Sequence, residues 1–317
     1  MLPIKEDNVS IRQIAGPIRK SPPGSISLSV LLCFIFLLSC QDRQKSEELK
    51  PADEKISVIT TIAPLYSFTK SVAGDYAEVE NLLPSGAEPH EYSLSPEDAI
   101  RISKARVVVT NGVGLETWLD KMLMEDKESD SPEKQIVVDS SSGVDIISND
   151  PHIWLSPKNA VIQVKNIRDA LIRADPANAE RYAETAGDYV KRLELLDREI
   201  REVTGPLKRK EFVSLHSAFL YFAKDYGLKE AAVIQETPES EPTPRHMAEI
   251  MDVIKTRKIR VIFSEPGVPH KIVETLAKDL NLQVYSLDTL ETGDVSAGWY
   301  EAKMRANLEV LKEAMNR

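Results

Sequence analysis

One long helical pattern between Asp175 and Gly205 constrains the fold of this chain more than any other feature of its sequence. Apolar residues recur there at helical spacing, and the opposite face is charged. Asp175 suits a helix start, and Gly205 suits a stop. The pattern predicts a helix of about 28 residues, roughly 42 Å long. Since short β-type runs alternate with helical patterns on both sides, we expect a rigid helix, residues 175–205, that joins two lobes. A coiled-coil arm is the alternative.

The composition is typical of a globular protein that does not bind nucleic acid. The chain has 317 residues, of which 42% are apolar and 28% charged, and its formal net charge is −10. This acidic balance offers no basic surface that would neutralise phosphates. Its two cysteines, Cys33 and Cys40, both lie near the N-terminus, so neither a disulfide framework nor a thiolate metal site is possible in the body of the chain.

The N-terminus is typical of a bacterial lipoprotein. The apolar run from Ser25 to Ser39 is short for a membrane span but suits the core of a signal peptide, and basic residues precede it. The run ends in Leu37-Leu38-Ser39-Cys40, which resembles a lipobox. We therefore expect residues 1–39 to be a signal peptide and Cys40 to be lipidated. Residues 40–54 are polar and should form a flexible tether. An ordinary secretory signal with a chance cysteine is the alternative.

Two α/β lobes, residues 55–174 and 206–317, are expected on either side of the long helix. Each contains about four β-rich runs separated by helical patterns, which predicts two (β/α)₄ lobes with parallel sheets. The runs lie near residues 55–61, 77–83, 106–110 and 135–139 in the first lobe and near 211–215, 230–234, 260–263 and 283–286 in the second.

Imidazoles and carboxylates gather at the predicted strand ends. His90, His152 and His216 follow or end strands, and so do Asp288 and Glu265. In open α/β sheets, ligands bind beyond the carboxyl ends of the strands. Imidazole and carboxylate suit Zn²⁺, which prefers four ligands in tetrahedral geometry.

Some of these residues have simpler interpretations. A lone strand-end histidine is usually a surface or capping residue, so the joint placement of three carries the argument. Glu265 could cap the next helix or orient a metal ligand instead of binding metal itself. His246 and His270 lie in predicted helices beside charged residues, and we interpret both as surface residues.

Several motifs resemble one family closely. The chain resembles the metal-binding receptors of bacterial zinc/manganese ABC transporters, the cluster A-I substrate-binding proteins of solute-binding protein family 9. The resemblance covers about residues 56–311. Its motifs are Leu83-Pro-Ser-Gly-Ala-Glu-Pro-His-Glu-Tyr92, Asp150-Pro-His-Ile-Trp-Leu-Ser-Pro157, His216-Ser-Ala-Phe-Leu-Tyr-Phe222 and Leu287-Asp288.

The resemblance implies a fold of two (β/α)₄ lobes joined by a long helix, and a site in which His90, His152, His216 and Asp288 are the metal ligands. The chain departs from the family pattern at Ser156, where Asp is usual. The acidic loop 125–133 lacks the histidines of many zinc members, so we expect no zinc-collecting role for it.

The function implied is a high-affinity zinc receptor that delivers Zn²⁺ to a membrane permease and its ATPase subunit. We expect a monomer, anchored by lipid on the extracytoplasmic face of the membrane, and not an enzyme. A manganese (Mn²⁺) receptor is the nearest alternative, although His216 stands where manganese members often have Glu. A metal-binding surface adhesin is a further alternative. A zinc hydrolase fits less well, because the sequence has no HExxH motif and four ligands leave no open position for water.

Overall fold

The computed structural model describes residues 55–119, 122, 134–235, 241–266 and 271–316. The expected signal peptide, Cys40, the tether and the acidic loop 125–133 lie outside the described residues. No helix in the described part of the chain is long and apolar enough to cross a membrane.

Lobe 1 is built on a four-stranded parallel sheet, as the alternating pattern predicted. Its strand order is β2-β1-β3-β4. Strand β3 is central and buried along its whole length, which suits its run of valines. The strands are β1 (Ile56–Thr60), β2 (Ala77–Asn81), β3 (Val107–Thr110) and β4 (Ile136–Asp139).

Lobe 2 repeats this topology. Its sheet is also parallel, with the order β6-β5-β7-β8, so the first strand of each lobe pairs with the second and third. The strands are β5 (Glu211–His216), β6 (Lys229–Gln235), β7 (Val261–Ser264) and β8 (Gln283–Ser286). The two parallel sheets confirm the predicted α/β fold with two lobes, and their carboxyl ends are where a ligand is expected.

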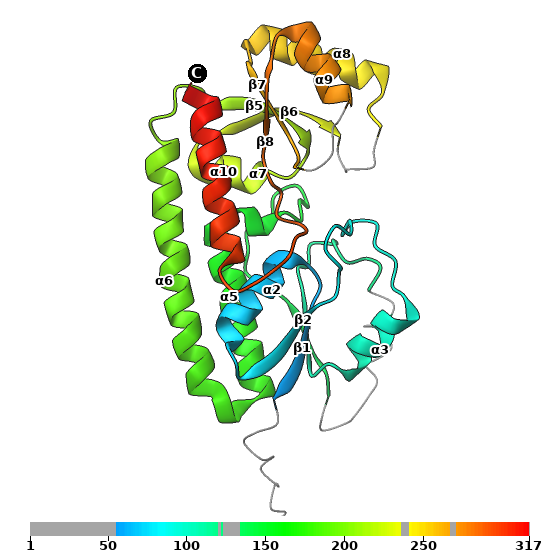
Figure 1. Cartoon of the computed structure of the whole chain (residues 1–317), viewed down its shortest axis with the longest axis vertical. Coiled ribbons are helices and arrows are strands. Elements are labelled where there is room, and N and C mark those ends of the chain that lie inside the picture. The colour runs from blue at the N-terminus through cyan, green and yellow to red at the C-terminus, as the bar shows by residue number, and fades with distance from the viewer. Residues whose placement is uncertain (1–54, 120–121, 123–133, 236–240, 267–270, 317) are drawn as a thin grey trace, which may run out of the picture. The chain divides into compact units, whose positions relative to one another are not determined.

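Helices follow the strands and pack on the sheets (Figure 1). Several begin with proline, whose fixed φ and missing N–H suit the first helical turn. In the described part of lobe 1, the helices are α2 (Ala63–Ala73), α3 (Pro96–Lys104), the short 3-10 turn η2 (Ile153–Leu155) and α5 (Pro157–Ala174). Those that follow β5 are α7 (Leu220–Tyr226), α8 (Pro244–Arg257), α9 (Lys271–Leu280) and α10 (Trp299–Asn316).

The long helix is α6 (Ala179–Thr204), and it begins later than the sequence predicted. A 3-10 turn, η3 (Pro176–Asn178), precedes it, because the carboxylate of Asp175 does not cap the helix. That carboxylate instead accepts hydrogen bonds from Asn178 Nδ2 at 2.7 Å and from the Tyr182 hydroxyl at 2.8 Å. The buried stripe of α6 packs against α5, α2 and α10, and Figure 1 shows α6 and α10 side by side.

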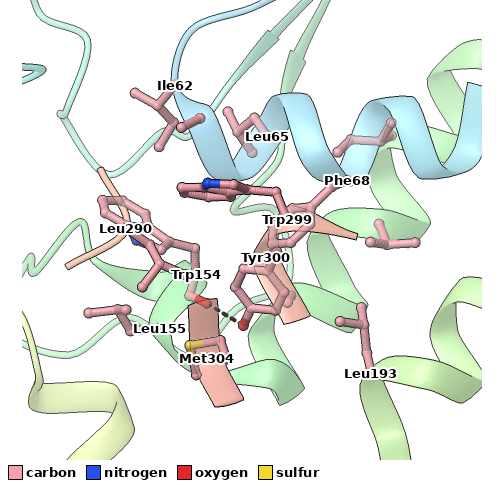
Figure 2. Packing of buried hydrophobic residues seen from close by; sticks show 14 of the residues in the cluster. Ile62, Leu65, Phe68, Trp154, Leu155, Leu193, Leu290, Trp299, Tyr300 and Met304 are labelled. Atoms are coloured by element: carbon pink, nitrogen blue, oxygen red, sulfur yellow. Dashed lines mark hydrogen bonds between the residues drawn. The ribbon is translucent and has the colours of Figure 1, made fainter. Parts of the chain in front are cut away.

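One hydrophobic core runs through both lobes. It includes Phe68 of α2, Leu193 of α6, Phe212 of β5 and Tyr300 of α10. Figure 2 shows Tyr300 between Phe68 and Trp154, and its hydroxyl donates to the Trp154 carbonyl at 2.7 Å. Since α10 returns from lobe 2 to pack against α2 of lobe 1, the two lobes share buried surface.

Candidate metal centre

Three histidines and one glutamate converge where the two lobes face each other. His90 lies in the loop after β2, His152 precedes η2, and His216 ends β5. Glu291 lies in the segment between β8 and α10. One donor atom from each of the four residues lies within 4.8 Å of the other three. The structure thus brings together all three histidines that the sequence singled out.

Glu291 contacts two of the three histidines. Its Oε1 atom lies 3.1 Å from Nε2 of His90 and 3.0 Å from Nε2 of His152. Its other oxygen, Oε2, accepts a hydrogen bond from the Thr289 hydroxyl at 2.8 Å. The carboxylate is 4% exposed, so its negative charge is held in place by these partners and not by water.

Asp150 orients His152. One carboxylate oxygen of Asp150 lies 2.6 Å from Nδ1 of His152 and also accepts the backbone N–H of the same residue at 2.9 Å. A carboxylate at Nδ1 favours the tautomer in which Nε2 is free to bind a cation. His152 is therefore fixed with Nε2 toward the centre.

His216 is buried without hydrogen bonds. Its Nδ1 atom lies 3.3 Å from Oε1 of Glu265, yet neither ring nitrogen makes a hydrogen bond within the described part of the chain. The ring centroids of His216 and His152 are 4.8 Å apart. A buried imidazole without partners is costly, and a cation at the centre would satisfy one of its nitrogens. Glu265 is not part of the four-residue group and lies beside Nδ1, where it can orient the ring.

Asp288, the carboxylate that the sequence predicted as a ligand, is not among the four converging residues, and Glu291 is the carboxylate found there. One oxygen of the Asp288 carboxylate accepts the backbone N–H of Leu290 at 2.9 Å, and the other pairs with Lys303 at 2.8 Å. The reason is local. Leu290 adopts a φ of 61°, in the left-handed region, which turns the chain after Asp288 and brings Glu291 to the histidines.

The segment that carries Glu291 is anchored to lobe 1. The indole N–H of Trp154 donates to the Thr289 carbonyl at 2.8 Å, and Leu290 is fully buried in the shared core, where Figure 2 shows it beside Trp154. A second tryptophan supports His90, since Trp118 Nε1 donates to the Pro89 carbonyl at 2.9 Å. His90, His152 and Glu291 are thus tied to lobe 1, and His216 faces them from lobe 2.

The charges within the group are coupled. Burial by itself lowers the pKa of His152, but its hydrogen bonds to Asp150 and Glu291 and their negative charges raise it to about 9. Burial favours the neutral form of Glu291, but the hydrogen bonds from His152 and His90 hold its pKa well below the usual range. Without a metal, a proton on His152 compensates the charge of Glu291. A cation would take over that role.

Comparison with known proteins identifies the family to which this chain belongs. Residues 58–314 match the family model described as zinc-uptake complex component A, periplasmic. The zinc-binding lipoprotein AdcA of Streptococcus pneumoniae is 34% identical over 89% of the chain, which spans 59% of that longer protein. The manganese ABC transporter substrate-binding lipoprotein PsaA of Streptococcus pneumoniae is 30% identical over 92% of the chain and 98% of its own length.

Solved structures agree. The Zn(II)-bound ZnuA-like domain of pneumococcal AdcA superposes with a TM-score of 0.72 at 33% identity, covering 83% of this chain and all of that domain. The range of the family model includes both lobes and all four converging residues. The chain therefore belongs to the zinc-uptake complex component A family of periplasmic substrate-binding proteins.

Proposed function

We propose that this protein is the zinc receptor of an ABC transporter, which captures Zn²⁺ between its lobes and delivers it to a membrane permease. The observation that carries this proposal is the convergence of His90, His152, His216 and Glu291, with one donor atom each, within 4.8 Å. Three nitrogens and one oxygen form the four-donor set that zinc prefers. In this set His90, His152, His216 and Glu291 are the zinc ligands, and Asp150 and Glu265 orient two of the rings.

Zinc is favoured over manganese by the nitrogen content of the site. Imidazole suits zinc, whereas manganese is better served by carboxylate, carbonyl and water oxygens. Relatives of both kinds exist, since AdcA is named for zinc and PsaA for manganese. A manganese receptor is therefore the alternative, and the donor set is the argument against it.

Hydrolysis fits the site less well. A catalytic zinc site usually has three protein ligands and a position left for water. Here four protein donors converge, and three of them are at most 4% exposed. The family consists of transport proteins, and we infer that this member binds zinc without chemically transforming a substrate.

The proposed function includes a lipid anchor and partner subunits of a transporter. Cys40 carries the lipid, and the receptor works on the extracytoplasmic face of the membrane as a monomer with a permease and its ATPase subunit. The lipoprotein names of its relatives support this assignment. Mass spectrometry of the native protein tests it, since a mature chain that does not begin with a lipidated Cys40 contradicts it.

The test of the proposed function compares zinc binding of the unmodified protein with that of His216→Ala. The substitution removes the donor supplied by lobe 2, so zinc affinity should fall by at least about tenfold. Titration against a chromophoric zinc chelator measures both. Equal zinc affinities, or an unmodified protein that binds no zinc, would refute the proposal.

A further inference from the structure

The hydroxyl of Thr289 is hydrogen-bonded to one of the two carboxylate oxygens of Glu291. It donates to Oε2 of Glu291 at 2.8 Å, and Thr289 is 5% exposed, so water does not compete for this bond. We propose that Thr289 holds Glu291 as a one-oxygen donor and thereby sets the preference of the site for zinc over manganese. This inference rests on the proposed function and adds a specificity-determining residue to it.

The backbone on both sides of the Thr289 hydroxyl is held by three sets of contacts. The carbonyl of Thr289 accepts the Trp154 indole N–H at 2.8 Å. The preceding residue, Asp288, is held through its backbone N–H and carbonyl by Asn307 of α10, at 2.9 and 2.7 Å. The following residue, Leu290, is buried in the core. The backbone that carries the hydroxyl is therefore held in place by lobe 1 and by α10.

The two oxygens of Glu291 consequently have different roles. Oε2 is engaged by Thr289, whereas Oε1 faces the Nε2 atoms of His90 and His152. An ion at the centre meets one carboxylate oxygen and three imidazole nitrogens. Asp150 contacts His152 through one carboxylate oxygen and is not among the four converging residues.

This arrangement discriminates between the two metals. Zinc is satisfied by four donors in tetrahedral geometry, but manganese favours six, mostly oxygens. A carboxylate that binds through both oxygens would add a donor and help manganese. The hydrogen bond from Thr289 to Oε2 holds the carboxylate in the orientation in which Oε1, and not Oε2, faces the histidines. Thr289 is thus a positioning residue, which acts on the ion through Glu291.

The experiment replaces Thr289 with Val, which has the same branched shape but no hydroxyl. Kd values for zinc and for manganese are measured by chelator competition in the full chain. We expect Thr289→Val to lower the preference for zinc over manganese by about tenfold, the scale on which such supporting partners change metal affinity. Thr289→Ser restores the hydroxyl and should restore the preference of the unmodified protein.

Thr204→Val is the matched control, because it removes another buried threonine hydroxyl. That hydroxyl donates to the Ile200 carbonyl at 2.8 Å near the end of α6, away from the four converging residues. The preference of Thr204→Val for zinc over manganese should equal that of the unmodified protein. If Thr289→Val leaves the preference unchanged, or if Thr289→Ser behaves like Thr289→Val, the inference is wrong.

X-ray absorption at the zinc edge tests the same point without any variant. The zinc-loaded unmodified protein should show four nitrogen or oxygen donors, and five or more would overturn the inference even if Thr289→Val does not fold. Failure of the proposed function looks different: the unmodified protein would then bind no zinc, or His216→Ala would bind it as tightly.

Discussion

The carboxylates of Asp288 and Glu291 lie three residues apart in the sequence but have different surroundings. Asp288 pairs with Lys303 and is part of the scaffold, whereas Glu291 lies among the histidines. We expect Glu291→Gln to weaken zinc binding by at least about tenfold, because an amide oxygen carries no charge and is a poor zinc ligand.

Asp288→Asn is the matched control for this substitution. It should leave zinc affinity close to that of the unmodified protein and cost stability instead, since it removes the ion pair with Lys303. Calorimetric titration of both variants with zinc measures the difference. A larger loss of zinc affinity in Asp288→Asn would restore Asp288 as the ligand.

Glu116 predicts a pH dependence of stability. Its carboxylate is buried and accepts hydrogen bonds from Thr61, Asn111 and Gly112, which follow β1 and β3. Burial raises its pKa to about 7 despite these hydrogen bonds. An acid whose pKa is raised by folding binds more protons in the folded state. Stability from this group is therefore complete below its unfolded pKa and declines as pH rises toward 7.

The test is Glu116→Gln, which has no charge to bury at any pH. The free energy of unfolding of this variant, relative to the unmodified protein, should rise between about pH 4.5 and 7, by as much as about 3 kcal/mol. Urea denaturation across this pH range measures the difference. A difference that stays constant or falls would contradict the assignment.

The sequence pattern selects the three histidines of the converging group but not Glu291. The chain has five histidines, and three of them lie at predicted strand ends, so the rule for parallel sheets selects them. The same rule selected Asp288, the first carboxylate after β8. Glu291 depends on the left-handed turn at Leu290, which no glycine or asparagine marks in the sequence.

Among the elements, α7 connects the two halves of the site. Its residue Tyr221 places its hydroxyl against lobe 1, where it accepts the N–H of Ile147 at 3.1 Å and donates to the carbonyl of Asp150 at 2.9 Å. Asp225 of the same helix accepts the Ser156 hydroxyl at 2.5 Å. The helix that follows His216 thus holds the loop that carries His152, and Ser156, the departure from the family pattern, has a partner in lobe 2.

Tyr221→Phe removes the two hydrogen bonds to Ile147 and Asp150 and leaves the rest of α7 unchanged. Loss of two hydrogen bonds should lower the free energy of unfolding by about 1–2 kcal/mol and weaken zinc binding, because the loop at Asp150 loses its support. Tyr226→Phe is the control, since its hydroxyl donates to Asp197 of α6 and not to that loop. Equal zinc affinities in the two variants would contradict this role of α7.

The elements themselves were predictable because local signals agree with the fold. Valine-rich runs, prolines at helix starts and the stripe of α6 all indicate the structure that forms. The start of α6 was not predictable in this way, because the carboxylate of Asp175 accepts hydrogen bonds from Tyr182 and Asn178 and does not cap the helix N-terminus. A side chain with several possible partners is not assigned by its place in the sequence alone.

For the whole molecule, the shared core predicts that zinc stabilises without large movement. A ligand that binds only the folded state at 1,000 times its Kd adds about 4 kcal/mol, which corresponds to a rise in melting temperature on the order of 10 °C. Calorimetry should show this rise in the unmodified protein and a much smaller one in His216→Ala. Small-angle scattering curves with and without zinc should nearly coincide, and a large change in radius of gyration would contradict a rigid α6.

The convergence of His90, His152, His216 and Glu291 predicts that these four residues hold one zinc ion. Anomalous diffraction at the zinc edge, from crystals grown with one equivalent of zinc, tests it most directly. We expect a single strong peak between the lobes, within about 2.0–2.2 Å of one donor atom from each of these four residues. A peak bound by Asp288 instead of Glu291, or a zinc ion away from His216, would contradict it.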